Sequence, residues 1–115
     1  MAEGAIYDKS FEFALEIIEL YKYLKAKKEY VLSSQILKSG TSIGANVEEA
    51  SAAQSKKDFI SKMSIASKEA RETRYWLRLL EKSQLIKYDY STYLEKAEEI
   101  IKILTAIVKT SGRNL

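Results

Sequence analysis

Carboxylate pairs are the residues of this sequence whose type and spacing come nearest to acid–base or metal chemistry. Glu69 and Glu72 lie one helical turn apart, and Glu98 and Glu99 are adjacent. Acid–base catalysis near neutral pH most often uses His, and metal sites in helical bundles combine carboxylates with a Glu-x-x-His motif. The 115 residues include no His and no Cys. We therefore predict a protein without catalytic residues, bound metal or cofactor.

The stretch SGTSIGAN, residues 39–46, has the glycine and hydroxyl residues of a phosphate-binding loop. It lacks the order Gly-x-x-x-x-Gly-Lys-Ser/Thr, because Lys38 precedes both glycines. Read as a helix, the same region places an apolar residue or glycine at every third or fourth position: Ile36, Gly40, Ile43, Val47 and Ala50. A glycine costs about 1 kcal/mol relative to alanine in a helix. We interpret the region as a helix whose glycines allow a neighbouring helix to approach closely.

Polar residues run beside this apolar stripe and continue on the next helix. We call them the polar seam: Gln35, Ser39, Ser42, Asn46, Glu49, Glu69 and Glu72. Buried polar groups must be hydrogen-bonded, and Trp76 offers an indole N–H to this set. The favoured interpretation is polar packing between two helices. The alternative is a reactive cluster formed by Asn46, Glu49 and Glu72.

A row of cations with one aromatic residue runs along the third predicted helix. We call it the basic track: Lys68, Arg71, Arg74, Tyr75, Arg78 and Lys82. Cations of this kind contact phosphates, and a tyrosine can stack on a base. The alternative is a solvated face whose charge is balanced by neighbours such as Glu81. The track is therefore a candidate surface for RNA or DNA.

Four helices are needed to position these residues. Hydrophobic spacing predicts helices over residues 10–28, 32–53 and 57–82, and a fourth from after residue 89 or 91 to about residue 110. Ser10 and Ser55 are the expected N-caps of the first and third helices. Long helices with short links pack antiparallel, so the predicted fold is all-α, an up-down-up-down four-helix bundle. We expect one domain over residues 1–115, with frayed ends at about residues 1–6 and 111–115.

The outer helices carry two apolar runs each. In the first helix the main run is Tyr7, Phe11, Ala14, Ile18 and Tyr21, and the second is Phe13, Ile17, Leu20 and Leu24. In the fourth the main run is Leu94, Ala97, Ile101, Leu104 and Val108, and the second is Ile100, Ile103 and Ile107. So wide an apolar arc indicates either a deep core or a subunit interface. We favour self-association.

Composition limits the remaining classes. The chain is 46% hydrophobic and 30% charged, with a net charge of +3, as is typical of a globular protein. The absence of Cys excludes disulfides and thiolate chemistry. The N-terminal residues do not resemble a signal peptide, and no stretch has about 18 consecutive apolar residues. We expect a cytoplasmic protein that does not bind membranes.

Residues 33–83 resemble the bacterial four-helix-bundle family of 23S rRNA intervening-sequence proteins. The family pattern falls on these positions: Gln35, Ser39, Ser42, Asn46, Glu49, Phe59, Ala66, Glu69, Glu72, Tyr75 and Leu77. Glu48 and Ser67 depart from it, where a small residue and Leu, respectively, are common. The resemblance implies four antiparallel helices, a ring-shaped homopentamer and no catalytic activity or cofactor. Similar proteins are accessory subunits of diversity-generating retroelements and bind nucleic acid.

Together these features predict a non-enzymatic oligomer that contacts RNA or DNA through the basic track, without base-specific readout. The alternative is an adaptor whose polar seam and second apolar faces bind another protein. An enzyme that uses the reactive cluster is the least favoured hypothesis.

Overall fold

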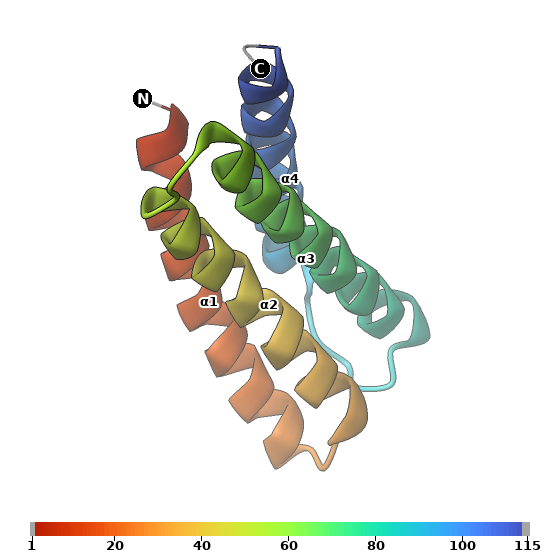
Figure 1. The fold of residues 1–115 in the computed structure, drawn as a ribbon. Coiled ribbons are helices and arrows are strands. Elements are labelled where there is room, and N and C mark those ends of the chain that lie inside the picture. Colours follow the sequence, from red (N-terminus) through yellow and green to blue (C-terminus); the bar gives the residue numbers. More distant parts are fainter. Residues whose placement is uncertain (1, 114–115) are drawn as a thin grey trace.

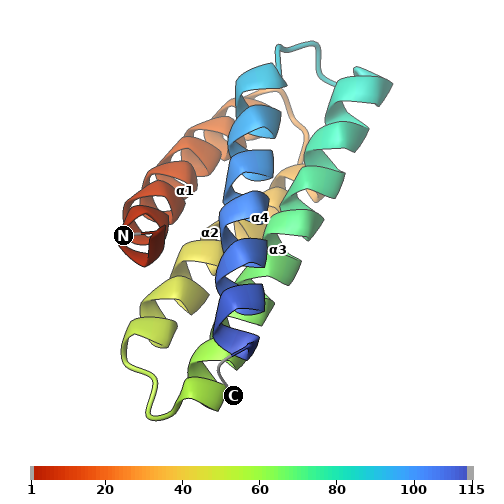
Figure 2. The ribbon, with the colours of Figure 1, turned by 90° about the horizontal axis from the view of Figure 1, so that it is seen from above.

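The structure is a computed structural model and describes residues 2–113. Its elements are helices α1 (Ala2–Ala26), α2 (Val31–Ser51), α3 (Lys56–Ser83) and α4 (Ser91–Gly112). Consecutive helices run in opposite directions and α4 returns beside α1, so each helix packs against two neighbours (Figures 1 and 2). The predicted all-α, up-down-up-down bundle is confirmed.

Two side chains set the starts of the central helices. Ser55 is the N-cap of α3, as predicted, because its hydroxyl accepts a hydrogen bond from the Asp58 N–H at 3.0 Å. The start of α2 uses a residue that sequence reasoning missed. The nearly buried Glu29 carboxylate accepts from the N–H groups of Val31, Leu32 and Ser33 at 3.1, 3.0 and 2.6 Å. It satisfies donors that a helix start otherwise leaves unpaired.

The predicted start of the first helix at residue 10 is wrong. The helix begins at Ala2, and Ser10 is buried inside it, where its hydroxyl donates to the Tyr7 carbonyl at 3.2 Å. Ile6 is fully buried and extends the helical spacing of the core residues toward the N-terminus. The prediction of frayed ends falls partly on residues 1, 114 and 115, which lie outside the described residues.

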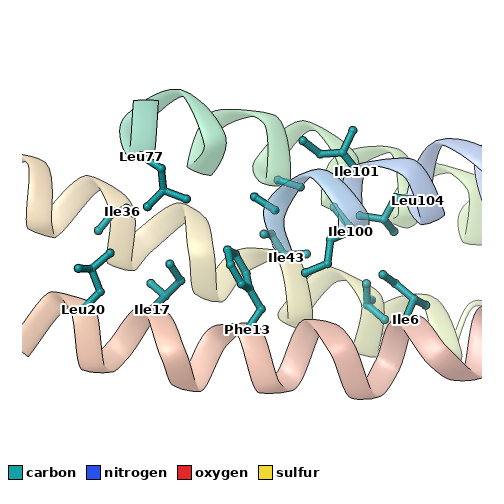
Figure 3. Close-up of a cluster of buried hydrophobic side chains, with 14 of the residues drawn as sticks. Ile6, Phe13, Ile17, Leu20, Ile36, Ile43, Leu77, Ile100, Ile101 and Leu104 are labelled. Atoms are coloured by element: carbon teal, nitrogen blue, oxygen red, sulfur yellow. The ribbon is translucent and has the colours of Figure 1, made fainter. Parts of the chain in front are cut away.

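The core of α1 is the run that was predicted to be secondary. Its buried apolar residues are Ile6, Phe13, Ile17, Leu20 and Leu24. Figure 3 shows labelled side chains of this run pointing into the space between the helices, toward Ile43 of α2 and Ile100 of α4. Of the expected main run, Phe11 and Ile18 are exposed, whereas Tyr7, Ala14 and Tyr21 are half-buried.

The second apolar run of α4 belongs largely to the core. Ile100 and Ile107 are buried together with Ala97, Ile101 and Leu104, whereas Ile103 is half-buried. For α4, the deep-core alternative is therefore correct, and the expectation of an interface on this run is wrong. Exposed large apolar side chains lie instead on α1, at the start of α2, on α3 and in the α3–α4 connection.

Gly40 explains why α2 includes glycine in a helix. A Cβ built at Gly40 would lie 2.8 Å from Cγ2 and 3.2 Å from Cβ of Ile17 on α1. The predicted close approach is confirmed at this residue. A Cβ at Gly44 would lie 3.4 Å from the Ser10 carbonyl oxygen, an ordinary contact distance. Only Gly40 is therefore required by packing.

Tyrosines close the end of the bundle where α3 connects to α4. Tyr90 is buried and its hydroxyl donates to the Ile86 carbonyl at 2.7 Å. The Tyr88 ring lies 4.5 Å from the Tyr23 ring of α1, measured between centroids. Burial raises the pKa of Tyr90 and of Tyr93 to about 12. This connection therefore packs as an extension of the core.

Candidate nucleic-acid interface and polar seam

The basic track lies along α3, and one of its residues, Arg71, contacts α4. Lys68, Arg71, Arg78 and Lys82 are exposed, Arg74 is half-buried, and Tyr75 is 54% exposed. From Lys68 to Lys82 the helix rises about 21 Å. The Trp76 ring packs edge-to-face against Tyr75, with 5.2 Å between centroids. The structure thus brings all predicted track residues onto one broad face of one helix.

The cations of the track form no salt bridge among residues 4–113, whose side chains the structure describes. The ion pairs found there are Lys9–Glu99, Lys22–Glu19, Lys62–Glu49 and Lys96–Glu16. None includes a track residue, and Glu81, the proposed balancing neighbour, forms none of them. The positive charge of the track is therefore not neutralised by direct pairing among the described residues.

Arg71 joins the track to α4. Its Nη2 donates to Oγ1 of Thr105 at 3.2 Å. Beside this bond, α3 and α4 enclose a groove of about 310 Å³, which we call the α3–α4 groove, lined by Ser64, Ser67, Arg71, Thr105, Val108 and Lys109. Sequence reasoning missed Thr105 and Lys109, because their place beside Arg71 depends on how α3 and α4 pack.

The inner part of the polar seam is a buried pair of hydroxyls. Ser39 of α2 and Thr73 of α3 are both fully buried, and their side-chain oxygens are hydrogen-bonded at 2.8 Å. Thr73 also lies within hydrogen-bond distance of the Glu69 carbonyl, at 2.8 Å. Thr73 was not among the residues predicted for the seam. Polar packing between helices is confirmed at this point.

Residues in the outer part of the seam form hydrogen bonds within α2 or an ion pair with the neighbouring helix α3. The Ser42 hydroxyl donates to the Lys38 carbonyl at 2.7 Å, and the Asn46 amide donates to the Ser42 carbonyl at 2.9 Å. Glu49 forms an ion pair with Lys62 of α3 at 2.9 Å. Gln35 is exposed. The polar seam is therefore buried at its centre, at Ser39, and exposed at its edge, at Gln35 and Glu49.

Glu69 and Glu72 lie half-buried on α3 beside the seam. Burial raises the pKa of Glu69, and the nearby Glu72 carboxylate raises it further, whereas Lys68 and Lys38 lower it. Glu72 accepts a hydrogen bond from the Trp76 indole N–H at 3.4 Å. Within the described residues, no three His, Cys, Asp or Glu side chains are grouped so that they could hold a metal ion. Of these two carboxylates, that of Glu72 is hydrogen-bonded to a neighbouring side chain.

The fold and surface define a class: a small antiparallel four-helix bundle with a polar seam between two helices and an unpaired basic face. The sequence matches the family described as 23S rRNA-intervening sequence protein over residues 3–106, and the chain belongs to that family. The resemblance seen in residues 33–83 is thus confirmed over most of the sequence.

A solved structure supports the same assignment. The chain is 50% identical to a Bacteroides thetaiotaomicron protein of unknown function from the S23 ribosomal protein family. The match covers 95% of this chain and 99% of that chain, with a TM-score of 0.90. No curated protein matches the sequence. Of the helices described, none combines the length and apolar character that crossing a membrane requires.

Proposed function

We propose that the protein is a non-enzymatic, cytoplasmic oligomer that binds RNA or DNA through the basic track without reading base sequence. The observation that supports this proposal is the row of track cations that form no salt bridge with the side chains of residues 4–113. Such cations are available to replace the counterions of a phosphate backbone. Tyr75, exposed among them, supplies a ring on which a base of any sequence can stack.

Binding to single-stranded RNA and DNA across a range of salt concentrations tests the proposal. We expect affinity to fall steeply with salt. Replacing Arg71, Arg74 and Arg78 together by Ala should weaken binding by roughly 100-fold and flatten the log–log salt dependence by about 2, since each lost phosphate contact removes about 0.7 for single strands.

A control triple variant separates the track from net charge. Lys22, Lys25 and Lys28 are exposed cations at or beyond the end of α1. Their combined replacement by Ala lowers the net charge of +3 by the same amount. We expect this variant to retain most of its affinity. Equal losses in the two triple variants, or a wild-type affinity that is insensitive to salt, would refute binding through the track.

Self-association is supported by apolar surface on α1. Phe11 is 65% and Leu15 is 51% exposed, and with Ile18 they border a groove of about 310 Å³ between α1 and α2. On α3, Ile65 and Leu79 are 38% and 37% exposed. Two unlike faces that meet head to tail generate a closed ring when the rotation closes. This geometry is compatible with the homopentamer that the resemblance implies.

Size-exclusion chromatography with light scattering tests the assembly. We expect a mass that is a multiple of 13.1 kDa, and a shift toward 13.1 kDa when Phe11 and Leu15 are both replaced by Glu. Circular dichroism should show unchanged helix content, because both side chains are largely outside the core. A wild-type protein of 13.1 kDa at high micromolar concentration would refute self-association.

A protein-interaction adaptor is the second candidate, and the α1–α2 groove is the observation that favours it. If the wild-type protein is monomeric and binds no nucleic acid, this apolar groove is left for a different protein. Its chemistry fits an amphipathic helix, because such grooves receive apolar side chains spaced three or four residues apart.

A further inference from the structure

The α3–α4 groove has the chemistry of an oxyanion site. Its lining combines two cations, Arg71 and Lys109, with the hydroxyls of Ser64, Ser67 and Thr105. A guanidinium has five N–H donors, and the bond to Thr105 uses one of them. The remaining donors, the ammonium group and the hydroxyls all suit a phosphate oxygen. Among residues 4–113, no Asp or Glu lines the groove.

The groove also continues the basic track. Ser64, Ser67, Arg71, Tyr75 and Arg78 follow one another on α3 at steps of three or four residues and so share one face. Tyr75 lies one helical turn, about 6 Å of rise, beyond Arg71. A strand whose phosphate lies in the groove would therefore place its next residues against Tyr75 and Arg78.

We propose that the α3–α4 groove seats one backbone phosphate of the bound nucleic-acid strand and fixes the position of the strand on α3. This inference rests on the proposed nucleic-acid function and adds to it a specific contact point. Arg71 and Lys109 bind the phosphate by charge, and the hydroxyls of Ser64 and Ser67 complete its hydrogen bonds. Thr105 acts through Arg71, whose guanidinium it holds at the mouth of the groove.

Ser67→Leu tests the groove without changing any charge, because the larger side chain would fill the space. Leu is common at this position in the family pattern, so the variant should fold. Ser34→Leu is the matched control, since Ser34 is exposed on α2 and far from the groove in sequence and fold. Binding of a single-stranded oligonucleotide should weaken roughly tenfold in Ser67→Leu and remain unchanged in Ser34→Leu.

Salt dependence distinguishes a lost phosphate contact from a general disturbance. The log–log slope should flatten by about 0.7 in Ser67→Leu, the change expected for one contact to a single strand. Thr105→Val is the second variant, in case Ser67→Leu does not fold. Valine is close to threonine in shape but lacks the hydroxyl that holds Arg71, so we expect this variant to bind the oligonucleotide roughly threefold more weakly.

The outcomes separate this inference from the function on which it rests. If wild type binds and the triple Arg variant does not, but Ser67→Leu and Thr105→Val both bind like wild type, the groove is not a phosphate site and the proposed function stands. If wild type binds no nucleic acid, both proposals fail. Weakened binding in Ser67→Leu, with a flatter salt slope and normal binding in Ser34→Leu, supports the inference.

Discussion

The two sides of α3 carry polar residues in comparable number but use them differently. Toward α2, Thr73 is bonded to Ser39, and Glu72 accepts from Trp76. Toward α4, Arg71 is bonded only to an exposed Thr105 hydroxyl. The other cations of the track form no ion pair with the described side chains, those of residues 4–113. On the side toward α2, polar groups of α3 form hydrogen bonds within the protein. On the other side, the cations present hydrogen-bond donors to solvent.

This difference separates two kinds of motif that look alike in sequence. The polar seam lies on residues of the family pattern, yet the structure uses its centre to pack two helices. Buried polar groups that satisfy one another stabilise the fold and are not available to a ligand. Exposed cations without partners contribute little to stability and can bind phosphate. The comparison therefore predicts that seam variants change stability and track variants change binding.

Thr73→Val should produce the larger effect on stability. The change keeps the side-chain shape but removes the hydroxyl, which leaves the buried Ser39 hydroxyl without its partner. We expect the free energy of unfolding to fall by about 1–3 kcal/mol, measured by urea or thermal unfolding. Nucleic-acid affinity of the folded variant should be unchanged.

Thr105→Val is the matched control on the other side of α3. Thr105 is exposed, so the substitution should change the free energy of unfolding of the protein by no more than about 0.5 kcal/mol. Nucleic-acid binding by the variant should nevertheless weaken. Together the two Thr variants test the comparison in opposite directions. If Thr73→Val weakens binding as well as stability, the seam is part of the binding surface and the two sides are not distinct.

Much of the fold could be predicted from helical spacing and capping. The bounds of α3 and the start of α4 were predicted within a few residues, because Ser55 and the break after Lys82 are strong local signals. The start of α1 and the identity of its buried face were not predicted correctly. Both of its apolar runs have helical spacing, and the choice between them depends on Ile17 fitting against Gly40, a contact between distant residues.

The candidate site could be predicted only in part for the same reason. Track residues share one helix, so their spacing was sufficient to group them. Thr105 and Lys109 join Arg71 through the packing of α4 on α3, which no local pattern encodes. Glu29 was missed because it follows three lysines in four positions, and no local pattern shows that its carboxylate caps α2.

Glu69→Gln should produce a smaller, pH-dependent effect on the seam side. Burial and Glu72 raise the pKa of Glu69 above its ordinary value of 4.5, so the folded protein holds this proton more tightly than the unfolded chain. The contribution of Glu69 to stability should therefore become more favourable as pH falls through its raised pKa toward 4.5. At pH 7 the ionised carboxylate is unfavourable, and Gln should stabilise the fold by a few tenths of a kcal/mol, given the screening of a half-exposed group.

Unfolding of both proteins at pH 7 and near pH 4 tests this sign. The advantage of Glu69→Gln should disappear near pH 4, where the wild-type carboxyl is protonated in both states. Glu95→Gln, at an exposed position on α4, controls for the general loss of a negative charge. A variant that is less stable than wild type at pH 7 would show that attraction to Lys38 and Lys68 outweighs burial and repulsion. The stability of the seam would then depend on attraction between the Glu69 carboxylate and Lys68 of the basic track. In that case the two sides of α3 would not be independent.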